Sequence, residues 1–414
     1  MQQTDTKESL AADAPSAAAA SGRDRFDLGG VLTAAAAHFT HDLYPSFVGP
    51  LLPLLIEKHG LSLAAAGALA TVPRWPALAM PLTGYIADRY DARGFVIWGP
   101  TVSALAMSSL GLAPNYATMV VLLLVAGFSS AAFHPAASAM ATQASGRQWG
   151  RGTSFFLTGG ELSRVVGPPF IVAVVSLFSL EGAWLAVVPA LAIWLLAYRK
   201  LGRGAQVKRR AAPAGLLAAV KARKGPLLVL IGVVTFRSLV IASFQTYYAT
   251  YLTGIGESLV YAGVALAVYE AGGTAGAFVG GPTSDRFGRR TVMALSQLAA
   301  GPLLFLALVW GGSTPGLAVL FLGGLLALSA GPVQLALAQE LLPGNRSAAS
   351  GIMMFLSFEG TVFATLMIGL LADAVGLQSA LAWSVLASML SLPFTFMLPE
   401  TRGGEQRAGH TVGR

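Results

Sequence analysis

Residues 281–290 read GPTSDRFGRR, and residues 84–93 read GYIADRYDAR. Each stretch has a glycine followed four residues later by an Asp-Arg pair, and each stands between apolar segments. Asp88 and Asp285 are 197 residues apart, and Glu161 and Glu359 are 198 residues apart. Nearly equal offsets at two independent places indicate that the second half of the chain repeats the first.

The composition is that of a membrane protein. Only 11% of the 414 residues are charged and 55% are hydrophobic, whereas a soluble domain carries about 25% charged residues. Residues 94–146 and 291–339 contain no Asp, Glu, Lys or Arg. A membrane-spanning helix needs about 20 residues, so each tract holds two spans and a turn. A soluble enzyme, a disordered chain and, because there is no Cys, a disulfide scaffold are all excluded.

Gly, Pro and charged residues divide the apolar sequence into twelve segments. We expect them at 29–56, 62–87, 95–113, 116–143, 152–178, 182–199, 226–253, 259–283, 291–310, 316–341, 348–372 and 377–398. The fold class is therefore an all-α membrane protein with twelve transmembrane helices in two pseudo-symmetric bundles. The expected domains are a cytoplasmic tail (1–28), a six-helix bundle (29–200), a basic linker (201–225), a second six-helix bundle (226–400) and a tail (401–414).

The basic residues give the orientation. If both termini are cytoplasmic, 23 of the 27 Lys and Arg residues fall in cytoplasmic tails and loops, and one, Lys58, falls outside. Basic residues accumulate on the cytoplasmic side of membrane helices, which explains the net charge of +8 without a nucleic-acid partner. The first 28 residues lack the apolar core of a signal peptide, so we expect them to stay as a cytoplasmic tail.

The pattern Gly-x-x-x-Asp-Arg-x-Gly-Arg-Arg at 281–290 resembles the signature of the major facilitator superfamily, whose members contain parallel six-helix repeats. Within that superfamily, three stretches resemble the fosmidomycin-resistance branch of drug:proton antiporters: HFTHDLY (38–44), GFSSAAFHP (127–135) and GGELSRVVGP (159–168). The resemblance implies a twelve-helix transporter of the bacterial inner membrane that exports drugs by alternating access.

The resemblance implies that the repeated loop motif acts as a gate. Its glycine allows close helix approach, and its aspartate can pair with basic residues and helix ends to latch the two halves. The gating residues are Gly84, Asp88, Arg89, Gly281, Asp285, Arg286, Gly288, Arg289 and Arg290. Gly167 and Pro168 match the antiporters' helix-kink motif. Glu161, Ser163 and Arg164 depart from the family pattern, and Glu161 and Arg164, three residues apart, can simply neutralise each other.

Ionisable residues in mid-span are the candidates for function. Each costs about 2.5–3.5 kcal/mol on insertion scales and normally faces the bundle interior. The candidates for carrying a coupled proton are Asp42, Glu161, Glu270 and Glu359. The candidates for lining a substrate cavity are His38, His41, Arg74, Trp75, His134, Arg164, Arg237 and Tyr247.

Several of these residues also have a structural interpretation. Arg74 and Arg237 can form salt bridges with Asp42 or Glu270, which would also act as gates between the halves. Gly272, Gly276 and Gly280 form a stripe of small residues that is typical of close helix packing.

The histidines leave two interpretations open. His38 and His41, three residues apart, can form a metal site with Asp42, but hydrogen bonding within the bundle is the commoner role, and we expect no metal. His134-Pro135 is more typical of a helix kink or a packing contact than of a substrate contact.

The sequence lacks the nucleotide-binding motif of a primary pump and the His-Glu-x-x-His and Gly-x-Ser-x-Gly motifs of common enzymes. We therefore expect no enzymatic activity and no cofactor, and we expect a proton gradient to be the energy source.

The favoured function is proton-coupled efflux of small amphiphilic compounds. The alternatives are uptake or exchange of a small anionic metabolite, attracted by the arginines, and a non-transporting membrane sensor. The expected partners are a small-molecule substrate, protons and the lipid bilayer, with the chain as a monomer.

Overall fold

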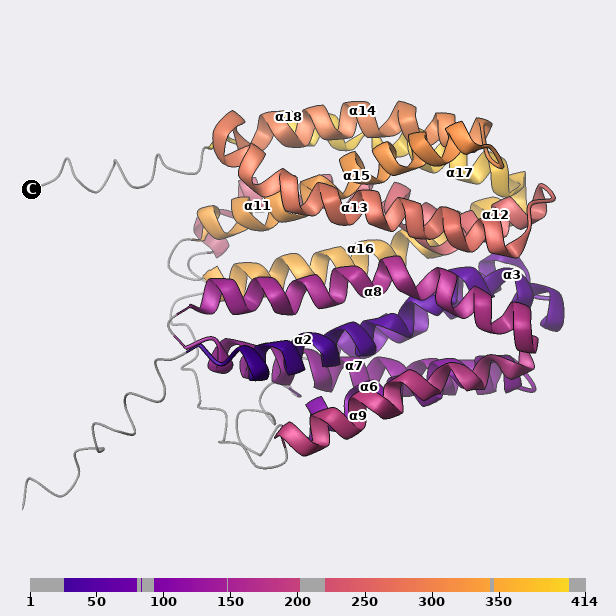
Figure 1. Cartoon of the computed structure of the whole chain (residues 1–414). Coiled ribbons are helices and arrows are strands. Elements are labelled where there is room, and N and C mark those ends of the chain that lie inside the picture. The colour runs from indigo at the N-terminus through magenta and orange to yellow at the C-terminus, as the bar shows by residue number, and fades with distance from the viewer. Residues whose placement is uncertain are drawn as a thin grey trace, which may run out of the picture.

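The computed structural model describes residues 26–79, 83, 93–146, 148–201, 220–342 and 346–401, and within these ranges helices follow one another with short turns (Figure 1). The first half comprises α2 (Leu28–Leu43), η1 (Pro45–Phe47), α3 (Val48–His59), α4 (Leu63–Thr71), η2 (Val72–Ala79), α6 (Arg93–Ser108), η3 (Ser109–Leu112), α7 (Tyr116–Ala144), α8 (Trp149–Phe178), η4 (Glu181–Val187) and α9 (Val188–Leu201). The second half comprises α11 (Lys224–Ala242), η5 (Ser243–Tyr247), α12 (Tyr248–Gly254), α13 (Leu259–Phe287), α14 (Arg289–Val309), α15 (Thr314–Leu341), α16 (Arg346–Val375), α17 (Leu377–Ser388) and α18 (Ser391–Met397). Most of the expected linker and both tails lie outside the described residues.

Ten helical segments of the described chain are long and apolar enough to cross a membrane. They coincide with the last ten expected spans, with ends that differ by a few residues. The first expected span is present as α2, η1 and α3, interrupted by a turn at Tyr44 just before Pro45, where a proline cannot donate a backbone hydrogen bond. The second is present as α4 and η2, and its remainder falls mostly outside the described residues.

Side-chain caps begin four helices at one end of the bundle. The side chains of Ser62, Asn115, Ser258 and Ser313 each accept a hydrogen bond from a backbone N–H three residues later, which satisfies a donor that the helix itself leaves free. We call this end the far end. The opposite end, where the described chain starts and stops, is the terminal end.

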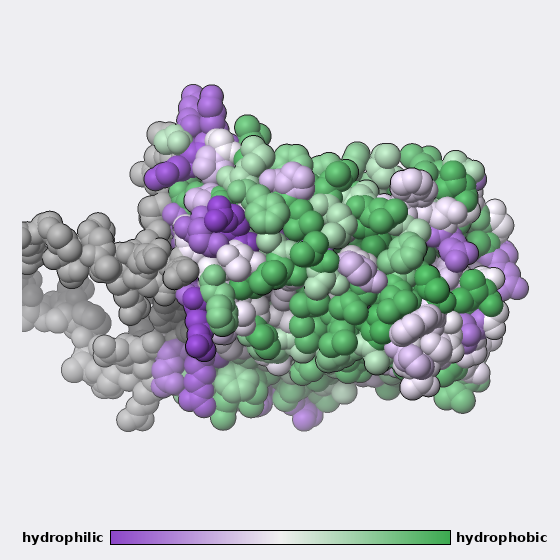
Figure 2. All heavy atoms as spheres, turned by 90° about the horizontal axis from the view of Figure 1, so that it is seen from above, coloured by the Kyte–Doolittle hydropathy of each residue, from purple (hydrophilic) through white to green (hydrophobic). Residues whose placement is uncertain are grey.

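A band of apolar side chains covers the middle of the molecule, while hydrophilic residues gather toward its two ends (Figure 2). Large hydrophobic side chains such as Val121, Leu228, Phe278 and Trp383 are more than half exposed. So large an exposed apolar surface is unfavourable in water, whereas it is what the hydrocarbon core of a bilayer requires. The chain is therefore a multi-pass membrane protein.

The helices of the two halves form two groups that meet along the middle of the molecule (Figure 1). Helix α8 packs on α13 and helix α4 packs on α16 across this boundary. One apolar cluster, which includes Tyr44, Phe47 and Met107, belongs to the first half. A second cluster belongs mainly to the second half but also takes in Leu52 and Ala66 of the first, so the two halves share part of their packing.

The glycine stripe of α13 is a packing surface, as its spacing predicts. A Cβ atom added to Gly272, Gly276 or Gly280 would lie 2.1, 1.9 or 2.2 Å from a backbone carbonyl oxygen of α15. Only glycine permits this approach, because any side chain would collide with backbone that cannot rotate away.

Replacing Gly276 with valine is therefore expected to separate α13 from α15 and to destabilise the protein by about 3 kcal/mol. The apparent melting temperature of the purified protein in detergent measures this effect. Gly281→Val is the matched control, because no atom lies within 4 Å of a Cβ built at Gly281. Equal melting temperatures for the two variants would contradict the packing role of the stripe.

Candidate functional site

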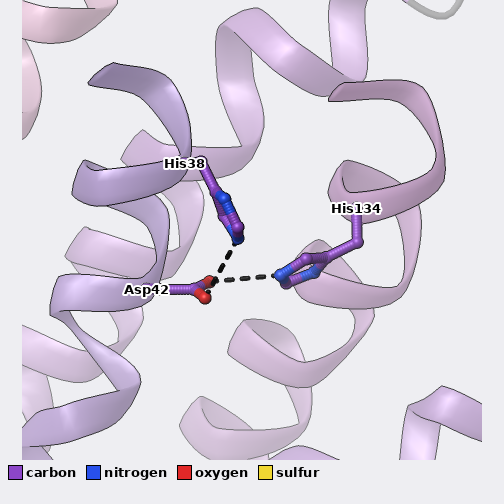
Figure 3. A group of neighbouring side chains, drawn as sticks. All are labelled: His38, Asp42 and His134. Carbon is purple, nitrogen blue, oxygen red and sulfur yellow. Dashed lines mark ion pairs between the residues drawn. The ribbon is translucent and has the colours of Figure 1, made fainter. Parts of the chain in front are cut away.

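Asp42 lies about midway along the first span and is surrounded by histidines (Figure 3). Nε2 of His38, one turn earlier on α2, lies 3.2 Å from Oδ2 of Asp42, and Nε2 of His134 on α7 lies 3.2 Å from Oδ1. Nδ1 of His41 lies 3.0 Å from the same Oδ1. We call these four residues the Asp42 cluster. The side chains of Asp42 and His134 are 22% and 25% exposed, so one side of the cluster is accessible.

Local packing fixes the imidazoles of the Asp42 cluster. His38 stacks on Phe156 with ring centroids 4.1 Å apart, and His41 stacks on Phe133 at 4.3 Å. A Cβ atom at Gly160 would lie 2.6 Å from Cε1 of His38. The second glycine of the Gly-Gly pair is thus required because the His38 ring occupies the place of a side chain.

Arg164 joins the two halves of the molecule. It forms an ion pair with Glu161, one turn earlier on α8, and its Nε lies 3.5 Å from Oε2 of Glu270 on α13. Gln245, in the π-helical turn η5, donates from Nε2 to Oε1 of Glu270 at 2.9 Å. The Glu270 side chain is only 8% exposed, whereas Arg164 is 37% exposed. We call Glu161, Arg164, Gln245 and Glu270 the Arg164 network.

The Arg164 network goes beyond the local neutralisation that the sequence suggested. Glu161 and Arg164 do pair, but the same guanidinium also reaches an acid of the other half. No local pattern selects Glu270 as this partner, because Glu270 lies more than a hundred residues away in the chain. No local pattern selects Gln245 either.

Arg237 does not pair with Asp42 or Glu270, so the expected salt bridge is wrong. Its Nε donates to the carbonyl of Ala327 at 2.9 Å, and its NH1 donates to Oε1 of Gln334 at 3.1 Å. Arg237 is only 9% exposed. No carboxylate of the described residues lies within ion-pair distance of it, and the nearby Nε2 of Gln334 is buried without a hydrogen-bond partner. Within the described residues, the second half therefore contains a buried cation without a counter-charge.

Arg74 and Glu359 are also isolated. Neither residue makes a hydrogen bond or an ion pair within the part of the chain that the structure describes. Arg74 and Glu359 are half-buried on η2 and α16, and Trp75 beside Arg74 is 48% exposed. The expected pairing of Arg74 with Asp42 or Glu270 is thus wrong here, while its place in a substrate cavity stays a prediction.

Tyr247 does not line an accessible surface. Its side chain is fully buried, and its hydroxyl lies 3.0 Å from the carbonyl oxygen of Thr365 and 3.3 Å from that of Leu63. A Cβ at Gly67 would lie 1.9 Å from this hydroxyl. Tyr247 therefore packs the two halves together near the far end, which is a different role from the cavity wall that the sequence suggested.

The Gly167-Pro168 motif serves a close helix contact. Helix α8 continues through Pro168 and ends at Phe178. A Cβ at Gly167 would lie 1.8 Å from Oγ of Ser46 and 2.9 Å from the carbonyl oxygen of Leu43. The glycine thus lets α8 approach the interruption in the first span.

The described copy of the loop motif ties together helices of the second half. Arg289 is buried, and its NH2 lies 2.6 Å from Oδ1 of Asp285 and 3.0 Å from Oε1 of Glu340 on α15. The side chain of Glu400 accepts from the backbone N–H of Arg290 at 3.0 Å. The expected latch between halves is thus wrong for these residues, whose partners all lie in the second half.

The glycines of the loop motif also differ from expectation. Gly288 has a φ of +101°, a conformation that L side chains rarely adopt. Gly281 faces open space, so the close approach expected there occurs one residue earlier, at Gly280. Arg286 is exposed beside Phe287, with its guanidinium 5.3 Å from the ring centroid. Gly84, Asp88 and Arg89 of the first copy lie outside the described residues.

The sequence reasoning missed a contact that joins the halves at the far end. Asp373, on the last turn of α16, accepts from the backbone N–H of Leu63 at 2.8 Å and of Ala64 at 3.0 Å. These are free donors at the N-terminus of α4, where a carboxylate is favoured by both hydrogen bonding and the helix dipole. A lone acid next to a loop gives no sequence signal for this role. We call Asp373, Leu63, Ala64 and Tyr247 the far-end contact.

Comparison with known sequences gives one family and two relatives. The family model described as Major Facilitator Superfamily matches residues 34–279 and 258–412. The chain is 29% identical over 376 residues to the uncharacterized MFS-type transporter YfnC of Bacillus subtilis (strain 168), covering 87% of this chain and 90% of that protein. It is 26% identical over 397 residues to the fosmidomycin resistance protein of Escherichia coli (strain K12), covering 93% and 96%.

Among solved structures, the fold is similar to that of a bacterial homologue of the human lysosomal transporter Spinster. The TM-score is 0.77 at 15% sequence identity, and the match covers 89% of this chain and 96% of the other. At this identity the likeness concerns the fold alone, and it confirms the helical arrangement expected from the repeat.

Proposed function

The chain belongs to the Major Facilitator Superfamily and is a membrane transporter, and we propose that it exports small amphiphilic compounds in exchange for protons. In this proposal both termini lie in the cytoplasm of a bacterial inner membrane, the chain has twelve spans and works as a monomer, and the two six-helix halves rock about the boundary between them. The basic residues of the loops support this orientation.

The export of amphiphilic compounds is supported by the similarity to a fosmidomycin resistance protein over nearly the whole chain. It is also supported by the mixture of groups near the boundary. Trp75 offers an exposed aromatic surface, and Arg164 and Asp42 offer accessible charge. A cavity lined in this way suits a ligand with an apolar body and a polar group.

Proton coupling is supported chiefly by the Arg164 network. Arg164 has one acid in its own half and one in the other half, so the ion pair with Glu270 must change when the halves move apart. A proton on Glu270 removes its charge and weakens its attraction to Arg164, which frees the boundary to open. Loss of that proton restores the pair. Ionisable residues at this depth are typical of proton pathways. Glu359, which is isolated on α16, is a weaker candidate for the same role.

The far-end contact supports an assignment of this conformation to the state that is closed toward the outside. Asp373 and Tyr247 join the halves there by hydrogen bonds to the first turn of α4. In the proposed orientation a substrate would then enter from the cytoplasmic side.

A second candidate function is uptake or exchange of an anionic metabolite. It is favoured by Arg237, because a buried cation without a counter-charge is costly and a substrate anion would supply that charge. Nε2 of Gln334 and the hydroxyl of Tyr269, both buried without a partner in the described residues, would add hydrogen-bond donors.

Transport by purified protein in liposomes with a trapped pH-sensitive dye tests the proposal. The compound panel contains fosmidomycin, lipophilic cations and small anionic metabolites, each added with and without an imposed pH gradient. We expect compound-dependent proton movement that protein-free liposomes do not show. Transport of anions without proton movement would support the second candidate instead, and no transport of any compound would overturn both.

A further inference from the structure

The hydrogen bonds of the Asp42 cluster indicate which imidazole nitrogens carry a hydrogen. Nδ1 of His38 lies 2.8 Å from the carbonyl oxygen of Phe156, and Nδ1 of His134 lies 3.0 Å from the carbonyl oxygen and 3.1 Å from the hydroxyl oxygen of Ser130. A carbonyl oxygen can only accept, so Nδ1 of His38 carries the hydrogen, and Nδ1 of His134 carries one whenever it bonds to the Ser130 carbonyl. In a neutral imidazole the other nitrogen, Nε2, then has a lone pair and no hydrogen. Both Nε2 atoms face the carboxylate of Asp42 (Figure 3).

An imidazole nitrogen without a hydrogen repels a carboxylate that it faces, so either a proton or a metal ion lies between each Nε2 and Asp42. In this tautomer the His38, His134 and Asp42 side chains offer two imidazole nitrogens and one carboxylate oxygen, and these atoms lie within 4.8 Å of one another. We propose that His38, Asp42 and His134 bind a divalent transition-metal ion of the Zn²⁺ type.

The distances fit such an ion. Zn²⁺ binds imidazole nitrogen and carboxylate oxygen at about 2.0–2.2 Å, so the ligand atoms of a tetrahedral site lie about 3.3 Å apart. Nε2 of His38 lies 3.2 Å from Oδ2 and Nε2 of His134 lies 3.2 Å from Oδ1, so each imidazole nitrogen is at this spacing from one oxygen of the carboxylate. Nitrogen ligands distinguish this set from Ca²⁺ and Mg²⁺ sites, which use oxygen atoms.

The surroundings also have the form of a metal site. Histidine ligands of metals usually donate their other N–H to a carbonyl or a carboxylate, which fixes the ring and the tautomer. Phe156 and Ser130 supply these carbonyls here. His41 supports the carboxylate from its buried side, with Nδ1 3.0 Å from Oδ1 of Asp42. His134 takes the place of His41 in the set that the sequence suggested, because His41 is fully buried behind the carboxylate while His134 enters from α7.

The site has one open side. Three protein ligands leave a fourth tetrahedral position for water or for another ligand, and the partial exposure of Asp42 and His134 places this position on the accessible side of the cluster.

Metal binding to the purified full-length protein tests the proposal. The protein carries an affinity tag without histidines, and Zn²⁺ binding is measured by competition with a fluorescent Zn²⁺ indicator. Co²⁺ serves as a second probe, because its visible absorption reports tetrahedral coordination. We expect one ion per chain. Asp42→Asn and His134→Gln are each expected to lower the affinity by more than about tenfold.

His59→Gln is the matched control, since His59 lies at the end of α3, away from the cluster, and its loss is expected to change nothing. His134→Cys keeps a metal-binding atom and is expected to retain Co²⁺ with an added sulfur-to-metal absorption band. The melting temperature of each variant reports whether it is folded. If His134→Gln is misfolded, the Co²⁺ spectrum of His134→Cys tests the role of this position instead. The proposal would be overturned if the folded wild-type protein bound no metal ion, including the case in which the cluster takes up protons but no metal. It would also be overturned if the cluster variants and the control bound Zn²⁺ with equal affinity.

Discussion

Glu270→Gln is expected to abolish substrate-driven proton movement while leaving substrate binding largely intact. Glutamine keeps the shape of the side chain and can still bond to Gln245, but it carries no charge and exchanges no proton near neutral pH. Among the described residues Arg164 then keeps only Glu161 as an acidic partner, so the ion pair that responds to the separation of the halves is gone. Proton movement is followed with a pH dye in liposomes, and substrate binding by a separate equilibrium measurement.

Two further variants sharpen this test. Glu161→Gln removes the acid of the same half and is expected to impair coupling as well, because Arg164 would then bind Glu270 without competition. Glu57→Gln is the matched control, since Glu57 is exposed at the end of α3, and it should transport as the wild type does. If Glu270→Gln and Glu161→Gln both retain the wild-type proton flux, the Arg164 network is structural and the coupling acid lies elsewhere.

Asp373→Asn is expected to open the far end. The carboxylate accepts two backbone hydrogen bonds at the N-terminus of α4, and an exposed charge at such a position contributes about 1 kcal/mol, with the charge-assisted bonds adding about as much again. Loss of about 1–2 kcal/mol shifts an equilibrium between two states by about 5- to 30-fold. The shift goes toward the state in which α4 and α16 are apart.

The absence of cysteine from the chain makes this shift measurable. Ala66 is fully buried at the boundary between the halves, so a single cysteine at this position reacts with a maleimide only when the far end opens. The labelling rate in detergent is expected to rise when Asp373→Asn is added to Ala66→Cys. Glu181→Gln is the control, because Glu181 at the far end pairs with Lys58 inside the first half. An unchanged rate with Asp373→Asn would show that this contact does not hold the halves together.

The sequence located the spans closely because the signal for each one is local. A bilayer demands about 20 apolar residues and a satisfied backbone wherever the chain crosses it, so hydropathy, capping residues and charges mark the ends of each helix. The helix α7 begins at Tyr116, as expected, because Asn115 caps it. The motif residues and the equal offsets of the repeat likewise gave the family, and the spacing of Gly272, Gly276 and Gly280 gave a packing stripe.

The partners of the charged residues were not readable in the same way. A charged residue in mid-span requires a partner, but the sequence does not indicate which helix faces it. His38 and His41 lie on the same helix as Asp42, so the sequence suggests contacts among these three residues. The structure adds His134 from α7. Arg237 was expected to meet an acid and instead meets Gln334.

Local sequence thus determined the membrane class, the two-bundle architecture, most helix boundaries and the list of ionisable residues in the bundle, because each depends on the contact of a short segment with lipid or water. Tertiary structure alone decided that Arg164 bridges to Glu270 and that Asp373 caps α4. It also decided that two imidazole nitrogens face one carboxylate. These contacts depend on the relative rotation and depth of helices far apart in the chain, which the packing of the whole bundle fixes.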